Sequence, residues 1–370
     1  MRTIKIDKVF LMTTLLLMLA GFIIFTSAAL GLLAGGGTEY YSVAFNHIVF
    51  GIIFGSVALI VMSRISYKHW RTFSVYIFII TLVGTFLVFV PGLGFAHGGA
   101  RRWVEIAGIS FQPGEFLKIG YILCLASWLS AVKERVATVR HGLVPFVILS
   151  SLVGAALLSQ PDTDSFLILF FSGAMMFLAA GARFKHIMLL AFAGIASIVI
   201  LAFIQPYIMS RIKTFFHPAN DPQGSGYQIQ QSLIAIGSGR LTGRGFGQSI
   251  QKFNFLPEPI GDSIFAVAAE EFGFVGSVII IFLFSLFALR GLRIAIRSPD
   301  VFSRLVTLGV VILIVSQSFL NMSAMLGVLP LSGLPLLFVS HGGSAMIVTL
   351  ALVGIVLNIS KYQLKNNYNN

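Results

Sequence analysis

The stretch VFLMTTLLLMLAGFIIFTSAALGLL, from Val9 to Leu33, decides the class of fold. It contains no charged residue and follows a short basic segment. A secretory signal has an apolar region of about 7–15 residues, whereas a helix that crosses a bilayer needs about 20. Ala28 and Ala29 resemble a cleavage site, but the length of the stretch favours a spanning helix that is kept.

The rest of the composition agrees with a membrane protein. Of the 370 residues, 57% are hydrophobic and only 10% are charged, which is more apolar surface than a soluble core can bury. The net charge of +12 does not indicate nucleic-acid binding, because basic membrane loops account for it. Cys124 is the only cysteine, which excludes internal disulfides and cysteine metal clusters. The seven histidines show no zinc-binding spacing.

Hydropathy predicts an all-α, polytopic membrane protein with about ten spanning helices, folded as a single domain over residues 1–370. The predicted helices are 9–33, 45–63, 72–90, 113–131, 142–159, 165–181, 186–204, 264–289, 304–325 and 343–359. A long loop at about 205–262 separates the seventh helix from the eighth. Loops of this length in a compact bundle are usually functional or disordered, and its aromatic residues and paired glycines indicate a folded one.

The distribution of basic residues orients the chain in the membrane. If the N-terminus is cytoplasmic, 17 of the 25 Lys and Arg residues fall in cytoplasmic segments. Every inner loop is then basic, so both termini are expected in the cytoplasm. The eight that fall elsewhere are Arg101, Arg102, Lys118, Arg211, Lys213, Arg240, Arg244 and Lys252. Most acidic residues lie on the outer side, where they suggest chemistry at the outer face.

Two groups of charges lie in the outer segment 98–118. Arg101 and Arg102 precede Trp103 and form either an anion site near the lipid headgroups or a pair at a helix end that extends toward water. Glu115 and Lys118, three residues apart, share a helix face inside an apolar span. Charges within a membrane are costly and usually face a cavity or a partner; the pair either serves a site or neutralises itself.

Other polar residues have simpler interpretations. Asp162 and Asp164 precede the sixth helix and are suited to cap it. Arg240 and Arg244, in the long loop, either hold phosphate or are merely solvated.

The stretch FLPEPIGDSIFAVAAEEFGFVG, residues 255–276, is unusually acidic for this chain. Asp262 precedes the eighth helix, where a cap would contribute about 1 kcal/mol. Glu270 and Glu271 lie two turns deeper, which capping does not explain, and they need a polar cavity or basic partners. The pattern suits an outward-facing cavity with a general base at its mouth.

These motifs together resemble the SEDS family of bacterial cell-wall polymerases, the FtsW and RodA proteins. The resemblance covers nearly the whole chain, in order: GARRW, FQPGEFLK, QPD, DPQGSGYQIQQSLIAIGSGRLTGRGFG, LPEPIGDSIFAVAAEEFGFVG and PLLFVSHGGSAM. The chain departs from the family pattern at Gly114, Asp164, Gly261, Ser263 and His341. GARRW and the ending LVGIVLNISKY favour the FtsW side, hence cell division rather than elongation and cell shape.

The resemblance implies a peptidoglycan glycosyltransferase that polymerises lipid II, a disaccharide-pentapeptide on undecaprenyl diphosphate, with inversion at the sugar. Asp262 takes the place of the family's catalytic carboxylate. The candidate substrate-binding residues are Arg101, Arg102, Glu115, Lys118, Arg240, Arg244 and Glu271. A divalent cation, Mg or Mn, is a candidate cofactor whose ligands are not identified, and no organic cofactor is expected.

The resemblance also implies partners and alternatives. The expected partners are lipid II, a class B penicillin-binding protein transpeptidase, other division proteins and membrane lipid, but not nucleic acid; the expected location is the bacterial cytoplasmic membrane. A lipid II flippase would use the same cavity without a base, and a division scaffold would need no substrate site. Asp262 discriminates between these functions, because only a polymerase requires its carboxylate.

Overall fold

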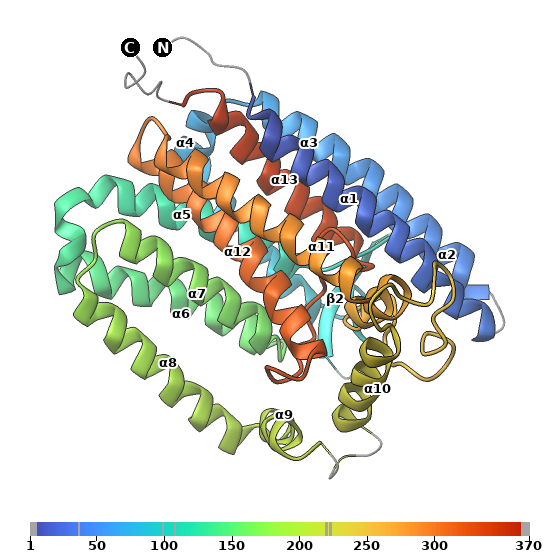
Figure 1. Ribbon diagram of the computed structural model, residues 1–370. Coiled ribbons are helices and arrows are strands. Elements are labelled where there is room, and N and C mark those ends of the chain that lie inside the picture. The colour runs from blue at the N-terminus through green and yellow to red at the C-terminus, as the bar shows by residue number, and fades with distance from the viewer. Residues whose placement is uncertain are drawn as a thin grey trace.

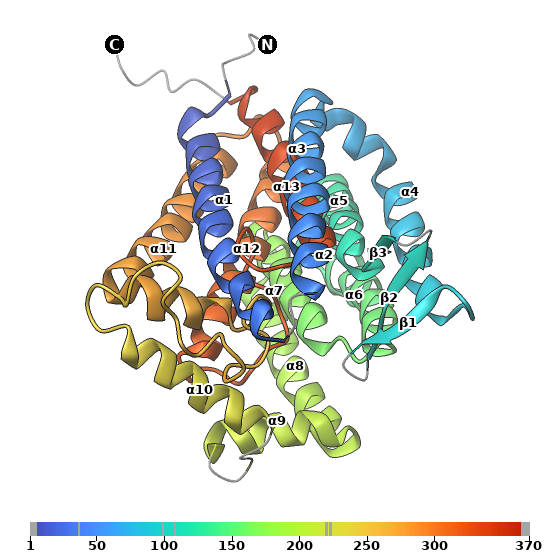
Figure 2. The same ribbon diagram turned by 90° about the vertical axis from the view of Figure 1, so that its right-hand side faces the viewer.

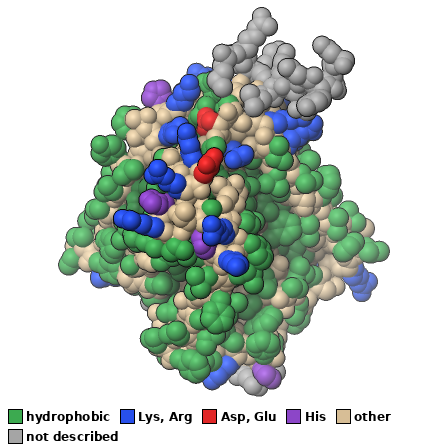
Figure 3. Space-filling view, turned by 90° about the vertical axis from the view of Figure 1, so that its left-hand side faces the viewer, with side chains coloured by type: hydrophobic (Ala, Val, Ile, Leu, Met, Phe, Trp, Pro, Cys, Tyr) green, Lys and Arg blue, Asp and Glu red, His purple; other side chains and the backbone are tan. Residues whose placement is uncertain are grey.

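The computed structural model describes residues 6–35, 38–97, 100–106, 109–218, 221 and 224–363. These parts form a helical bundle in which the chain enters and leaves at the same end (Figure 1). A small sheet and two short helices gather at the opposite end (Figures 1 and 2). On the face seen in Figure 3, hydrophobic side chains cover the middle and the far end, whereas basic side chains are most frequent toward the end that carries the termini. The protein is therefore a multi-pass membrane protein.

The helices match the segments that hydropathy predicted. The described part of the chain contains nine helices that are long and apolar enough to cross a membrane, and a shorter apolar helix over Thr163–Ala179. Each of the ten predicted segments overlaps one of them. The α-helices are α1 (Lys8–Ala29), α2 (Thr38–Asn46), α3 (Phe54–Arg64), α4 (Tyr67–Thr85), α5 (Pro113–Val132), α6 (Val144–Leu158), α7 (Thr163–Ala179), α8 (Phe184–Ile204), α9 (Pro206–Phe216), α10 (Ser225–Ser238), α11 (Ile264–Ile296), α12 (Val301–Met325) and α13 (Gly343–Ser360). A π-helical turn over His47–Ile53 joins α2 to α3.

The core of the bundle lies along its last two helices. Over the most apolar 18 residues of each helix, 89% are buried in α13 and 67% in α12, whereas only 11% are buried in α8. The helix α13 packs on α3 and α12 packs on α11, while α8 contacts only its sequence neighbours α7 and α9 strongly. The few contacts and low burial of α8 place it at the edge of the bundle. Its apolar side chains can face lipid there, because a spanning helix satisfies its backbone hydrogen bonds internally.

A three-stranded antiparallel sheet precedes α5, where the sequence indicated only an irregular outer segment. Its strands are β1 (Gly94–His97), β2 (Ala100–Ile106) and β3 (Ile109–Phe111), in the order β1-β2-β3. The strands are three to seven residues long and contain glycines and charges, so their periodicity was too short to detect. The sheet places residues 100–103, the described part of the GARRW motif, beside the end of the bundle opposite the termini (Figure 2).

The helix α11 is broken at Gly273, whose backbone angles are φ 65° and ψ −162°. The segment 240–245 crosses the break and satisfies the backbone groups that it exposes: Phe274 donates to the carbonyl of Arg240, and Arg244 donates to the carbonyl of Glu270. The crossing is so close that a side chain on Gly273 would collide with the backbone of Gly243. The described residues of the predicted loop 205–262 therefore include two helices, α9 and α10, and a segment that is built into the break in α11.

Candidate active site

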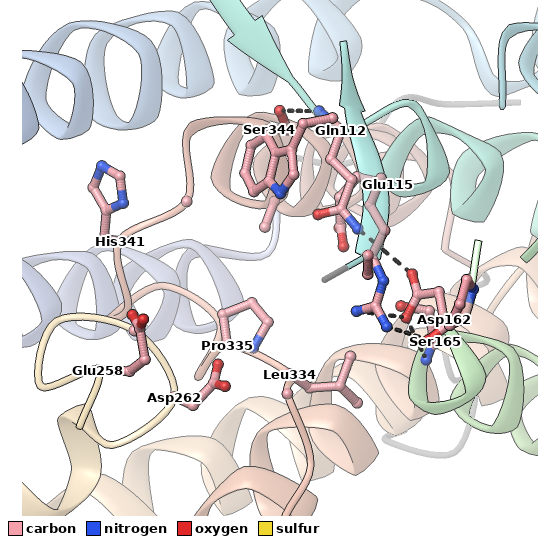
Figure 4. A pocket seen from close by; sticks show the side chains of 18 of the residues that line it. Gln112, Glu115, Asp162, Ser165, Glu258, Asp262, Leu334, Pro335, His341 and Ser344 are labelled. Carbon is pink, nitrogen blue, oxygen red and sulfur yellow. Dashed lines mark hydrogen bonds and ion pairs between the residues drawn. The ribbon is translucent and has the colours of Figure 1, made fainter. Parts of the chain in front are cut away.

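A pocket of about 590 Å³ opens at the end of the bundle opposite the termini. Its walls come from β2, from the first turns of α5, α7 and α13, from α9, and from the two loops 258–262 and 333–342. Figure 4 shows Asp262, Glu258 and His341 on one side and Glu115 and Asp162 on the other. Of the eight predicted site residues, Asp262, Arg102 and Glu115 line this pocket.

Asp262 and Glu258 are the pocket carboxylates whose oxygens have no hydrogen-bond partner among the described residues, and Asp262 is the one that directly precedes the N-cap of α11. The N-cap of α11 is Ser263, and no side-chain cap bond is formed there; the interpretation of Asp262 as a helix cap is therefore wrong. Burial, the neighbouring charge of Glu258 and that of Asp164 raise the pKa of Asp262 to about 7, while Arg211 and Arg102 oppose the rise. A carboxylate with this pKa is suited to accept a proton near neutral pH.

Backbone hydrogen bonds fix the loop that carries Asp262. Ser340 donates through its hydroxyl to the carbonyl of Gly261, at 2.7 Å, and the backbone N–H of His341 donates to the carbonyl of Ile260, at 2.8 Å. The amide of Asn321, on α12, donates to the carbonyls of both Asp262 and Leu334, each at 2.8 Å. The two loops of the pocket are thus joined to each other and to the core helix α12.

Arg102 closes another side of the pocket, but its guanidinium is already occupied. Its Nε donates to the carbonyl of Gln160 at 3.1 Å, and a second nitrogen donates to the carbonyl of Pro161. The third lies 3.5 Å from Asp162. Asp162 also caps α7 by accepting a hydrogen bond from the backbone of Ser165, so its predicted capping role is confirmed.

Glu115 and Lys118 form the predicted ion pair, with 2.7 Å between Nζ and Oε1. Both side chains are buried, and Lys118 also donates to Gln317, which in turn donates to the carbonyl of Pro335. Only Glu115 lines the pocket. Lys118 lies behind it, where it can hold the Glu115 carboxylate in place.

The remaining predicted residues do not line the pocket. Arg101 and Arg240 are exposed, and Arg244 lies 3.4 Å from the carboxylate of Glu270. The predicted substrate contact of Glu271 needs correction: its carboxylate is buried and accepts hydrogen bonds from Lys252, at 2.7 Å, and from the hydroxyl of Ser27. Basic partners therefore explain the acidic pair.

Glu270 and Glu271, both on α11, hold the segment 249–252 against this helix. Glu270 accepts hydrogen bonds from the hydroxyl of Ser249 at 2.6 Å and from the backbone N–H groups of Ile250 and Gln251. With Lys252 on Glu271, both carboxylates are used to hold the segment 249–252. We refer to Glu270, Glu271, Ser249 and Lys252 as the buried anchor.

Sequence reasoning missed Arg211, Tyr207 and Glu258, which also line the pocket. Arg211 forms an ion pair with Asp164 at 2.7 Å, and Gly333 donates its backbone N–H to the same carboxylate oxygen at 3.0 Å. The signal was present in the spacing of Tyr207 and Arg211, which four residues apart share one face of a helix. The preceding Pro206, at the first helical position, also marked the start of a helix.

The pocket has a limited capacity to bind a metal by itself. Within the ranges that the structure describes, no three His, Cys, Asp or Glu side chains are grouped as metal ligands. Mg²⁺ is commonly held by one or two carboxylates together with phosphate oxygens of a substrate. The pocket carboxylates fit only this second kind of site.

Comparison with known proteins identifies relatives of this arrangement. The family model for FtsW, RodA and SpoVE, described as cell cycle protein, matches residues 7–365. Stage V sporulation protein E of Bacillus subtilis is 36% identical over 356 residues, which cover 96% of this chain and 97% of that protein. The probable peptidoglycan glycosyltransferase FtsW of Geobacter metallireducens is 39% identical over 308 residues, which cover 83% of this chain and 82% of that protein.

Two solved structures have the same fold. One comes from a peptidoglycan synthase complex that coordinates polymerization and crosslinking; it has a TM-score of 0.73 and 27% identity, and the match covers 92% of this chain and 96% of that one. The rod shape determining protein RodA of Thermus thermophilus has a TM-score of 0.71 and 24% identity over 97% of this chain and 98% of its own. Because the family model spans nearly the whole chain and full-length relatives exceed 30% identity, the chain belongs to the FtsW/RodA/SpoVE family of cell cycle proteins.

Proposed function

We propose that this chain is a peptidoglycan glycosyltransferase that polymerises lipid II at the outer face of the cytoplasmic membrane, in cell division or cell shape. The family and the names of its relatives support the reaction class. The observation that carries the proposal is Asp262, a carboxylate that is held in an open pocket and has no internal hydrogen-bond partner among the described residues. Its pKa of about 7 matches that of an efficient general base.

The proposed reaction joins two sugars by displacement. The 4-hydroxyl of the acceptor attacks the anomeric carbon of the donor, and Asp262 accepts the proton of that hydroxyl. The new bond forms between the hydroxyl oxygen and the anomeric carbon, while the bond from this carbon to the diphosphate oxygen breaks. The diphosphate leaves with the bonding electrons. Because the hydroxyl attacks from the opposite face in a single displacement, the anomeric configuration inverts.

The negative charge of the leaving diphosphate requires a cationic partner. Arg102 lies in the pocket wall, whereas Lys118 lies behind the wall and is already paired with Glu115. A divalent cation, Mg or Mn, would neutralise charge in the same place, held by pocket carboxylates and diphosphate oxygens. No step of the proposed reaction depends on it.

The proposal includes the orientation and the partner. With both termini in the cytoplasm, as the basic inner loops favour, the pocket faces outward, where the product is needed. The structural relative in a peptidoglycan synthase complex supports a penicillin-binding protein as the partner. Co-purification from native membranes with a class B transpeptidase would test this assignment.

The decisive experiment replaces Asp262 by Asn in the purified full-length protein. We expect loss of polymer formation from lipid II, because the amide cannot accept the proton, while the melting temperature is retained. Polymerisation at the wild-type rate would refute the base. A flippase needs no base, so transfer of labelled lipid II across vesicles that survives the substitution, without any polymer from the wild-type protein, would instead favour that function.

A further inference from the structure

The helix α9 brings a positive charge into the pocket. It lies between the far ends of α8 and α10 (Figure 1). The hydroxyl groups of Tyr207 and Thr163 are 2.8 Å apart, and Arg211 donates to Asp164 at 2.7 Å. Both contacts are made to the first turn of α7. They fix the pocket-facing side of α9, and the guanidinium carbon of Arg211 lies 5.2 Å from the centre of the Tyr207 ring.

Arg211 is a neighbour of the proposed base. A Cβ atom placed on Gly333 would be 3.6 Å from Nη2 of Arg211 and 3.7 Å from Oδ2 of Asp262. The guanidinium and the carboxylate therefore flank the same glycine, which has no side chain to separate them. Their charges interact: Arg211 lowers the pKa of Asp262, which Glu258 and Asp164 raise. Arg102, from β2, acts in the same direction as Arg211.

The guanidinium of Arg211 has unused donors. Its Nη1 binds Asp164, and the other two nitrogens make no hydrogen bond to the residues that the structure describes. Arg102 differs, because all three of its nitrogens are engaged by Gln160, Pro161 and Asp162. A guanidinium has five N–H groups in a planar fork that matches phosphate oxygens. Arg211 is therefore the pocket arginine with capacity for an anion.

The charge balance of the pocket points the same way. Lys118 neutralises Glu115, and Arg102 lies next to Asp162. Asp262 and Glu258 have no cation within ion-pair distance in the described part of the chain. An entering diphosphate adds negative charge beside these carboxylates, so it needs a donor close to Asp262 whose hydrogen bonds are not exhausted.

We propose that Arg211 binds the diphosphate of the lipid-linked donor beside Asp262, and that Asp164 holds its guanidinium in position for this contact. The inference rests on the proposed function, since that function supplies the diphosphate substrate. It assigns α9, rather than the exposed Arg240 and Arg244, as the element that recognises the leaving group.

The test uses Arg211→Gln and Arg211→Lys in the full-length protein. We expect Arg211→Gln to raise the KM for lipid II about tenfold, which corresponds to about 1.4 kcal/mol, and Arg211→Lys to restore part of it. The acidic limb of the pH–rate profile should move to higher pH, because the charge that lowers the pKa of Asp262 is lost. Lys213→Gln is the matched control, since this exposed lysine on the same helix borders a separate pocket. It should change neither quantity.

Binding without turnover separates this inference from the proposed function. Undecaprenyl diphosphate should compete with labelled lipid II about tenfold more weakly in Arg211→Gln than in wild type; inorganic diphosphate, as a second competitor, tests the anion without the lipid. The role of Arg211 would be overturned if Arg211→Gln melted like wild type and kept the wild-type KM, acidic limb of the pH–rate profile and competition by undecaprenyl diphosphate. This holds even if Asp262→Asn is inactive. Conversely, an active Asp262→Asn would refute the role of Asp262 as the base. The competition experiment would still test Arg211, because it measures binding and not turnover.

Discussion

The ionisation of Asp262 predicts how catalysis depends on pH. Burial first, and the charges of Glu258 and Asp164 next, raise the pKa of Asp262 from 3.8 to about 7. The base must be ionised to accept a proton, so roughly nine tenths of the protein is competent at about pH 8 and roughly one tenth at about pH 6. We expect kcat/KM to fall about tenfold over this range, whereas a carboxylate with its ordinary pKa would leave the rate nearly constant.

The assay measures initial polymerisation rates at subsaturating lipid II across this pH range, at constant ionic strength. Melting temperature at each pH controls for unfolding. Glu258→Gln provides a matched variant: it removes the neighbouring charge that raises the pKa of Asp262 most, so the acidic limb should move to lower pH. A profile that is flat down to about pH 5, or a limb that is unchanged in Glu258→Gln, would refute the assignment of Asp262 as the titrating base.

The same shift predicts an effect on stability. The native protein binds the proton of Asp262 more tightly than the unfolded chain does, so the free energy of unfolding decreases as the pH rises from about 4 to about 7 and stays reduced above that. The upper bound on this penalty is about 4 kcal/mol. Water in the pocket screens part of it, and we expect Asp262→Asn to stabilise the protein by about 1–2 kcal/mol at pH 8. If Asp262→Asn lowered the free energy of unfolding at about pH 8, the idea that ionised Asp262 destabilises the native protein would be contradicted.

Two further predictions concern the stability of the scaffold, and one concerns substrate binding. Lys252→Met should lower the free energy of unfolding by about 3–5 kcal/mol, measured by denaturation in detergent, because it leaves the carboxylate of Glu271 buried and unpaired; equal stability would show that the pair is not needed. Gly273→Ala should cost about 2 kcal/mol or more, because of its positive φ and the close crossing of the chain, and an unchanged melting temperature would contradict that strain. Lys118→Met should weaken binding of labelled lipid II about tenfold by releasing the carboxylate of Glu115, and unchanged binding would exclude that positioning role.

The sequence was sufficient for the helices and for part of the pocket. Uninterrupted apolar segments report membrane spans directly, because every spanning backbone must satisfy its hydrogen bonds within a helix. The pairing of Glu115 with Lys118 followed from their spacing alone, since residues three apart in a helix are neighbours. Asp262 was identified by the family motif, whereas local physics suggested a helix cap that is not formed.

What the sequence did not provide depends on long-range contacts. Arg211 and Asp164 lie on different helices, and nothing in either segment specifies their pairing. Similarly, Lys252 is distant from Ser27 in the chain but donates a hydrogen bond to it. Glu271 was interpreted as a substrate contact because a buried charge in a membrane protein often marks a site. Its partner, Lys252, reaches it only when the segment 249–252 folds against α11.

The acidic stretch of residues 255–276 divides its carboxylates between two tasks. Glu270 and Glu271 belong to the buried anchor and hold the segment 249–252 against α11, while Glu258 and Asp262 face the pocket. The loop with the base is therefore held at both ends by one helix: through the anchor before it, and by direct entry into α11 after it. The same helix also carries the break that receives residues 240–245. The position of the Asp262 loop therefore depends on carboxylates, Glu270 and Glu271, that do not line the pocket.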